Sequence, residues 1–195
     1  FDEWNTYVEA TPPYFIENYN IADAIYAASL LNACINRGDI ITNTGIYHLI
    51  NVMGNYRIEK KKIWKTPTTL VLELYTKFHK GKILKSVVNS SNFVSFKLGK
   101  QPEYKNNKLI DSAVTMNGKH MCMSVVNKSS SEKILLKVPY LDRIAENYCI
   151  EGSNKVDLNT YANTSKVKIK QNSLKTNKGF LILPPHSISV VLFNI

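Results

Sequence analysis

The sequence has only three cysteines among its 195 residues, and it has no long run of apolar residues. Cys34, Cys122 and Cys149 lie far apart, and each has apolar neighbours. An odd, widely spaced set of cysteines argues against both a disulfide framework and a zinc site, so we expect buried free thiols in a reducing compartment. An apolar run such as residues 188–193 is far too short to span a bilayer.

Several motifs of enzyme chemistry are also missing. There is no Gly-rich phosphate-binding loop and no Gly-x-Ser-x-Gly turn that would carry a nucleophilic serine. The four histidines lack the spacing of metal ligands, so we predict neither a metal site nor another cofactor. The first residues show no initiator methionine, basic segment or signal-type apolar stretch, and we therefore expect the natural N-terminus to lie upstream.

Positive charge is in excess, with a formal net charge of +10 and a pI of about 9.4. Such an excess can indicate binding to nucleic acid, to an anionic membrane surface or to an acidic substrate. Most lysines are scattered along the chain, and the only tight cluster is Lys60-Lys61-Lys62, with Arg57 nearby. We therefore predict a solvated basic surface, without a nucleic-acid or membrane partner.

The first 81 residues carry two segments with helical periodicity. Apolar residues recur at intervals of three and four from Ile21 to Ile35, and Asn20 can cap the start of this helix. A second helix is predicted from Pro67 to Lys80, with Thr66 as its cap. Residues 47–54 between them predict a short buried strand. Strands that alternate with helices are typical of a parallel α/β sheet.

The period of the apolar residues changes to two after residue 82. Nine short strands are predicted, at residues 86–88, 93–98, 109–116, 120–126, 133–138, 148–151, 166–170, 179–183 and 187–193. Turn-forming pairs such as Asn117-Gly118 and Pro184-Pro185 separate them, and Met121, Met123 and Val125 share one face of their strand. This pattern predicts an antiparallel β-sandwich.

The one candidate catalytic motif is Asp2-Glu3-Trp4-Asn5, which follows a possible strand end and precedes a turn-rich stretch at residues 11–13. Acidic residues at the carboxyl ends of parallel strands are where α/β barrels hold catalytic groups. An Asp-Glu pair alone would more often be a surface pair at a frayed end. A tryptophan beside the carboxylate, however, offers an apolar wall and a stacking face for a sugar.

The stretch Phe1-Asp2-Glu3-Trp4-Asn5 resembles the strand-end motif of glycoside hydrolase family 51 α-L-arabinofuranosidases, in which the Glu is the nucleophile. Further motifs follow in the family's order through nearly the whole chain, at residues 19–24, 31–33, 39–40, 49–52, 66–68, 73–75, 125–127, 152–159 and 183–187. The resemblance implies a fold that is α+β by content. The last βα units of a (β/α)₈ barrel would occupy residues 1–81, and a jelly-roll-like antiparallel β-sandwich would occupy residues 82–195.

The function that this resemblance implies is hydrolysis of terminal α-L-arabinofuranosyl groups, with retention and without a cofactor. The substrates would be plant polysaccharides such as arabinan, or oligosaccharides. Glu3 corresponds to the nucleophile, Trp4 would shape the sugar pocket, and Tyr7 would line the aglycone side; a core-edge tyrosine is the equal alternative for Tyr7. The family's acid/base glutamate lies in an earlier strand, so we predict that the chain alone is inactive. The family's sugar-binding glutamine is absent from residues 64–67.

A partial barrel would leave strand edges and apolar helix faces open. We therefore expect a missing N-terminal barrel segment, a complementary chain or a homo-oligomer as partner, and we expect the protein to be cytoplasmic. Two other functions stay open at this point. One is a non-catalytic carbohydrate-binding or structural β-sandwich module, and the other is a basic nucleic-acid-binding domain, which the scattered lysines disfavour.

Overall fold

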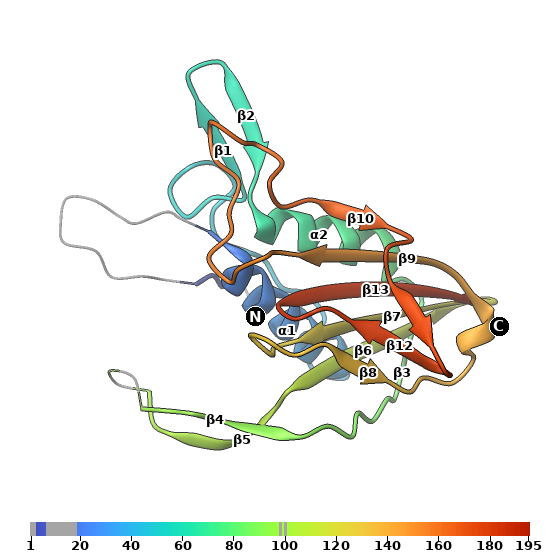
Figure 1. Cartoon of the computed structure of the whole chain (residues 1–195). Coiled ribbons are helices and arrows are strands. Elements are labelled where there is room, and N and C mark those ends of the chain that lie inside the picture. The colour runs from blue at the N-terminus through green and yellow to red at the C-terminus, as the bar shows by residue number, and fades with distance from the viewer. Residues whose placement is uncertain (1–2, 7–18, 98, 100) are drawn as a thin grey trace.

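The computed structural model describes residues 3–6, 19–97, 99 and 101–195 (Figure 1). A six-stranded antiparallel sheet forms its centre. Helices α1 (Ile21–Asn36) and α2 (Pro67–Phe78) cover one face of this sheet, and a three-stranded sheet covers the other. The predicted antiparallel β-sandwich is therefore confirmed, with the two helices packed directly on it.

The central sheet has the strand order β10-β9-β13-β7-β6-β3. Its strands in chain order are β3 (Lys82–Leu84), β6 (Ile110–Asn117), β7 (His120–Asn127), β9 (Ile144–Glu151), β10 (Ile169–Gln171) and β13 (Ser187–Asn194). The smaller sheet has the order β11-β12-β8, with β8 (Ile134–Leu136), β11 (Lys175–Asn177) and β12 (Phe180–Leu183). A short 3-10 helix, Leu141–Arg143, precedes β9.

Two hairpins lie outside these sheets. Strands β1 (Tyr56–Glu59) and β2 (Lys62–Lys65) form the first, which projects from the helical side of the molecule at the top of Figure 1. Strands β4 (Asn92–Ser95) and β5 (Tyr104–Lys108) form the second, at the bottom of the same view. The sequence pattern predicted a strand near β4 but did not predict the hairpin β1–β2.

Alternating residues of the central strands face two separate cores, as the period of two predicts. On β13, Ile188 and Val190 belong to the cluster beneath the helices, whereas Val191 and Phe193 belong to the cluster beneath the smaller sheet. Met123 and Val125 of β7 face the smaller sheet together, with Met121 packed against the same cluster, so the predicted shared face is confirmed. The cores thus lie on both faces of the six-stranded sheet.

Both helices begin where the capping residues predict. The Asn20 side chain accepts from the Ala22 and Asp23 N–H groups at 2.8 and 3.4 Å, while Asp23 accepts from the Asn20 N–H, which completes a capping box. Thr66 Oγ1 accepts from the Thr69 N–H at 3.4 Å at the start of α2. No helix in the described ranges is long and apolar enough to cross a membrane.

The buried strand predicted at residues 47–54 is wrong. Within the described part of the chain, the parallel pairing here consists of two isolated bridges, Trp4 with Ile46 and Ile50 with Tyr56. Leu49 and Ile50 are 63% and 48% exposed, because no described segment covers the apolar side chains that suggested a strand interior. The strand predicted at residues 86–88 is also absent, and this stretch is an irregular connection.

Candidate functional site

Trp4 anchors the N-terminal motif beside the helices. Its N–H donates to the Gly45 carbonyl at 3.1 Å and its carbonyl accepts from the Tyr47 N–H at 3.0 Å, which forms the parallel bridge to Ile46. The indole N–H donates to Thr44 Oγ1 at 2.6 Å, and the side chain is 7% exposed. Backbone and side chain therefore fix this residue together.

The indole lines a cavity of about 480 Å³ between α1, α2 and the loop of residues 38–46. Glu3 precedes Trp4 and is exposed. Successive side chains of an extended segment point to opposite sides, so Glu3 is directed away from the helices. The arrangement places a carboxylate on the outer side of a segment whose next residue is buried.

Asn5 holds the loop of residues 47–53 against the N-terminal segment. Its side-chain amide donates to the carbonyls of Tyr47 and Met53, the latter at 2.8 Å, and its Oδ1 accepts from the Thr6 N–H at 2.9 Å. Met53 and Asn51 have φ values of 55° and 56°, in the left-handed region. Such conformations cost about 1 kcal/mol per residue and persist where the surroundings hold them, as Asn5 does here.

Asn55 connects this loop to the start of α2. Its side-chain amide donates to the His48 carbonyl at 3.0 Å. Its own carbonyl accepts from the Thr66 N–H at 2.9 Å and from the Thr66 hydroxyl at 3.0 Å, and the Thr69 hydroxyl donates to it as well. The orientation of the loop of residues 47–53 is therefore tied to the cap of the second helix.

The loop of residues 152–166 fastens the hairpin β1–β2 to the sandwich. Trp64 donates its indole N–H to the Asn159 carbonyl at 3.1 Å. The Asn159 amide donates to the carbonyls of Lys65 and Val167 at 3.0 and 2.9 Å, and its Oδ1 accepts from the Val167 N–H at 2.7 Å. A single buried side chain thus joins β2 to the segment that leads into β10.

The same loop supports α1 through Asp157. Its carbonyl accepts from the Ile21 N–H at 3.0 Å at the first turn of the helix. The bond from Lys166 at 2.8 Å, with further bonds from Ser153 and the Asn154 N–H, lowers the pKa of the Asp157 carboxyl to about 2. This carboxylate is committed to structural contacts.

A buried polar network lies between the helices and the central sheet. Asn32 accepts from the Tyr75 hydroxyl at 2.7 Å and from Ser124 Oγ at 2.5 Å, and it donates to Asp111, which pairs with Lys128 at 2.8 Å. Burial raises the pKa of the Tyr75 hydroxyl above its ordinary value. The network satisfies polar groups in the core, and its donors and acceptors are used by one another.

Further titratable groups of the described residues include His79 and the three cysteines, which are partly or fully buried. Among residues 3–6, 19–97, 99 and 101–195, no group of three or more His, Cys, Asp or Glu side chains could hold a metal ion. Burial lowers the pKa of His79 to about 4, so its ring is neutral at pH 7. The three cysteines are free and buried, as predicted.

Of the predicted site residues, Glu3 and Trp4 lie in the described structure, and Tyr7 lies outside the described residues. The contacts of Trp4 are those of an anchoring side chain, and its predicted sugar contact stays a prediction. Sequence reasoning missed Asn55 and Asn159 as residues that hold this side of the molecule. Each bonds to backbone groups far away in the sequence, for which a single sequence gives no signal.

A family profile described as the α-L-arabinofuranosidase C-terminal domain matches residues 2–187. An "intracellular exo-alpha-(1->5)-L-arabinofuranosidase" of Streptomyces lividans is 24% identical over 185 residues, which cover 86% of this chain and 27% of that protein. The chain therefore spans about a quarter of the length of this relative.

Solved structures of α-L-arabinofuranosidases have the same fold. An arabinose complex from Thermotoga maritima superimposes with a TM-score of 0.85 at 24% identity, over 100% of this chain and 42% of that one. A family 51 protein from Thermotoga petrophila gives 0.84 at 24% identity, over 99% and 42%. The chain belongs to the α-L-arabinofuranosidase C-terminal domain family, and it corresponds to the C-terminal portion of the glycoside hydrolase family 51 proteins that its motifs resemble.

Proposed function

We propose that this chain is the nucleophile-bearing part of a retaining α-L-arabinofuranosidase. The whole protein removes terminal α-L-arabinofuranosyl residues from plant polysaccharides such as arabinan, or from oligosaccharides. Residues 1–81 are the last βα units of its barrel and residues 82–195 its sandwich. The observation that carries the proposal is the exposed Glu3 next to the anchored Trp4. Trp4 forms a parallel β-bridge with Ile46.

In this mechanism the Glu3 carboxylate attacks the anomeric carbon, and an ester bond to the sugar forms as the glycosidic bond breaks. A second carboxyl group, about 5 Å from the first, gives its proton to the leaving oxygen and then takes one from the water that cleaves the ester. That second group belongs to an earlier barrel strand outside this chain. The chain alone is therefore inactive. Trp4 anchors the segment that carries Glu3, and its sugar contact, like that of Tyr7, stays a prediction.

The rest of the barrel also has a surface to cover. Five apolar side chains around the first hairpin are between 42% and 63% exposed, and we call them the rim patch: Leu49, Ile50, Val52, Ile58 and Ile63. Backbone bonds and strand pairing join their segments, because the Tyr56 N–H donates to the Leu49 carbonyl and Ile58 pairs with Ile63. Apolar patches of this kind mark interfaces. We assign the rim patch to the N-terminal barrel segment, with a second copy of the chain as the alternative cover.

The comparison with the Streptomyces lividans relative and the three cysteines support one compartment. The Streptomyces lividans relative is described as intracellular, and three free, buried thiols suit a reducing environment. We propose that the protein acts in the cytoplasm, on arabinose-containing oligosaccharides that have entered the cell.

The test is to restore the barrel and then remove the carboxylate. The chain would be co-expressed with the N-terminal barrel portion of the Thermotoga maritima relative, or fused to it, and assayed with 4-nitrophenyl α-L-arabinofuranoside. Glu3→Gln should lower the rate by at least about 10³-fold, because the attacking group is lost. The matched control is Glu59→Gln, an exposed carboxylate of β1, which should leave the rate unchanged.

Full activity in Glu3→Gln would remove this residue from the mechanism. Glycan binding without turnover in the restored protein would instead favour the non-catalytic carbohydrate-binding module.

A further inference from the structure

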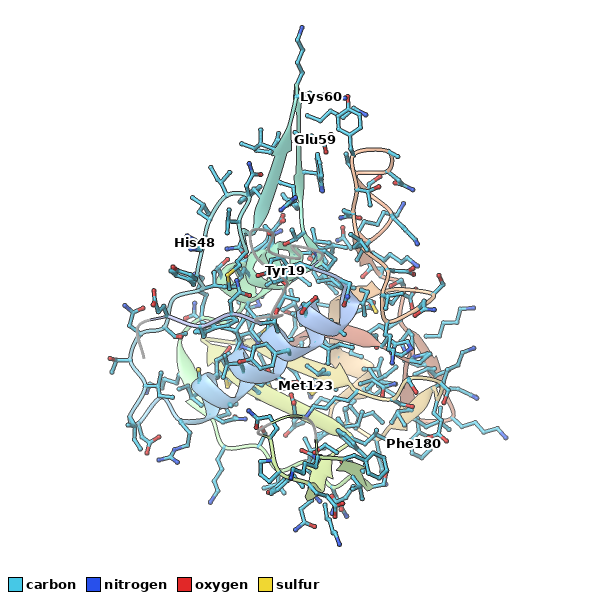
Figure 2. The ribbon with its side chains drawn as sticks, turned by 90° about the vertical axis from the view of Figure 1, so that its left-hand side faces the viewer. Tyr19, His48, Glu59, Lys60, Met123 and Phe180 are labelled. Carbon is cyan, nitrogen blue, oxygen red and sulfur yellow. The ribbon has the colours of Figure 1, made fainter. Side chains whose placement is uncertain are left out.

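The turn of the first hairpin has an unusual sequence for its geometry. Glu59 pairs with Lys62, so Lys60 and Lys61 form a two-residue turn, and Lys60 has a φ of 53°. Turns of this length favour Asn or Gly at positive φ, and a lysine there is strained. The strained turn lies at the tip of the hairpin, where Figure 2 labels Lys60. Strain that packing does not require is a reason to look for a function.

Tyr161 lies beside this turn and is held by it. Lys62 Nζ is 4.4 Å from the centre of the Tyr161 ring and donates to the Tyr161 carbonyl at 3.2 Å, and Lys60 Nζ is 5.3 Å from the same ring. On its other side the ring contacts Trp64 edge-on, with 6.3 Å between centroids. Asn159 fixes Trp64 in turn. We call Lys60, Lys61, Lys62 and Tyr161 the lysine–tyrosine platform.

The charge around this platform is positive. Residues 56–65 contain five basic side chains and one acidic side chain, Glu59. Asp157 in the neighbouring loop is paired with Lys166, and Lys65 is paired with Glu73 at 2.6 Å. Three consecutive ammonium groups on a narrow tip therefore attract anions, and the formal net charge of +10 adds to this field.

The chemistry of the platform fits one class of ligand. An aromatic ring packs against the apolar face of a sugar, and ammonium groups pair with carboxylates. A neutral arabinan would use only the ring, whereas a polysaccharide that contains uronic acids would use both. A nucleic acid duplex presents phosphates over a wider area than a two-residue turn can contact. The combination of one ring with adjacent lysines therefore favours an acidic glycan.

We propose that the lysine–tyrosine platform binds the carboxylate groups of uronic-acid residues in the oligosaccharides that carry the arabinofuranosyl groups. The proposal rests on the proposed function, since it names the backbone to which the substrate groups are attached. The hairpin follows the loop of residues 47–54. Asn5, which lies two residues after Glu3, donates to the Met53 carbonyl of this loop. The loop and the hairpin therefore join the platform to the segment that carries Glu3.

The test measures binding by the 195-residue chain itself, without catalysis. Isothermal titration calorimetry would compare an oligogalacturonate with a neutral arabino-oligosaccharide of equal length, at 20 and 200 mM NaCl. The first variant is the triple substitution K60Q/K61Q/K62Q, and the second is Tyr161→Leu. The matched control is K133Q/K137Q/K175Q, which also removes three charges. These lysines lie in or next to β8 and β11 of the smaller sheet, which covers the face of the central sheet opposite the helices. Circular dichroism would verify that every variant is folded.

We expect the oligogalacturonate to bind at least tenfold more tightly than the neutral sugar at low salt, and this preference to shrink at 200 mM NaCl. The hairpin triple variant should weaken oligogalacturonate binding by about tenfold, since it removes three exposed ion pairs that are each weak. Tyr161→Leu should weaken it by about fivefold, because the stacking face and the cation–π contacts are lost. The control triple variant should bind as the unchanged chain does.

Equal affinity for both glycans, or an equal loss in the two triple variants, would overturn the proposal. Tighter binding to a DNA oligonucleotide of the same charge than to the oligogalacturonate would overturn it in favour of nucleic acid. Because this readout needs no hydrolysis, it is independent of the Glu3→Gln assay. If the platform does not bind the oligogalacturonate, the proposed arabinofuranosidase activity is unaffected. If Glu3→Gln keeps full activity, the measured glycan binding is unaffected.

Discussion

Asn159→Ala tests whether one buried amide holds the hairpin to the sandwich. Asn159 is 5% exposed, and its side chain makes three hydrogen bonds to backbone groups of Lys65 and Val167, at 2.7–3.0 Å. Each such bond contributes about 1 kcal/mol, and a buried backbone group that is left without a partner costs about 1–3 kcal/mol. We expect a loss of about 3 kcal/mol in the free energy of unfolding. For a chain of this length, that loss lowers Tm by about 6–12 °C.

The assay is urea unfolding followed by circular dichroism, with Tm from calorimetry. Asn163→Ala, in the same loop, is the matched control, because its side chain accepts one exposed bond from the Ser165 N–H at 3.3 Å. It should change stability by less than about 0.5 kcal/mol. Asn159→Asp keeps the bond from Val167 but turns a charge towards two carbonyls, so it should be no more stable than Asn159→Ala. A loss in Asn159→Ala no larger than that in the control would refute the reasoning.

Two further predictions concern the backbone and the pH dependence of stability. Gly81 has a φ of +79°, and a Cβ there would lie 2.3 Å from the Met116 carbonyl oxygen, whereas Gly118 has a φ of +60° with open space around it. Gly81→Ala should cost about 3 kcal/mol and Gly118→Ala about 1 kcal/mol in urea unfolding, and equal losses would contradict the close contact. The Lys166 bond lowers the pKa of Asp157 to about 2, so its contribution is present above its ordinary pKa and is lost as the pH falls from about 4 to 2. The urea midpoint of Asp157→Asn should fall less steeply over this range, and parallel curves would show that the contribution is absent.

Local signals in the sequence were enough for most of the secondary structure. Helix α1 starts after Asn20 and helix α2 after Thr66, because each cap is a short polar side chain directly before an apolar repeat. Strands β7 and β13 were predicted within one residue, since each is a mostly apolar run between turn residues and both of its faces are buried. The two buried faces of these strands line the two cores of the sandwich.

Other elements have no such signal. The hairpin β1–β2 lacks the Asn-Gly turn that usually marks a hairpin, and its lysines were interpreted only as surface charge. Strand β5 is almost entirely polar, because it pairs with β4 outside both cores. Residues 47–54 gave the opposite error, since their apolar side chains are exposed on the rim patch and were taken for a strand interior.

The candidate site was predictable only where a motif carries it. Glu3 and Trp4 came from a five-residue match, and burial of Trp4 next to an exposed carboxylate agrees with an alternating segment. The side chains that support this motif were not predictable in the same way. Thr44 and Asn5 bond to residues about 40 positions away, and only the folded chain shows such pairs.

The measurement that tests the central claim most directly is identification of the covalent intermediate. The restored protein, with its barrel completed, would be incubated with a 2-fluoro arabinofuranoside, whose ester with the enzyme hydrolyses slowly. The protein would then be digested and analysed by mass spectrometry. The account predicts one added 2-deoxy-2-fluoro-arabinofuranosyl mass on the peptide that contains Glu3, and no label in Glu3→Gln. A label on another carboxylate, in a protein that still hydrolyses arabinofuranosides, would contradict it.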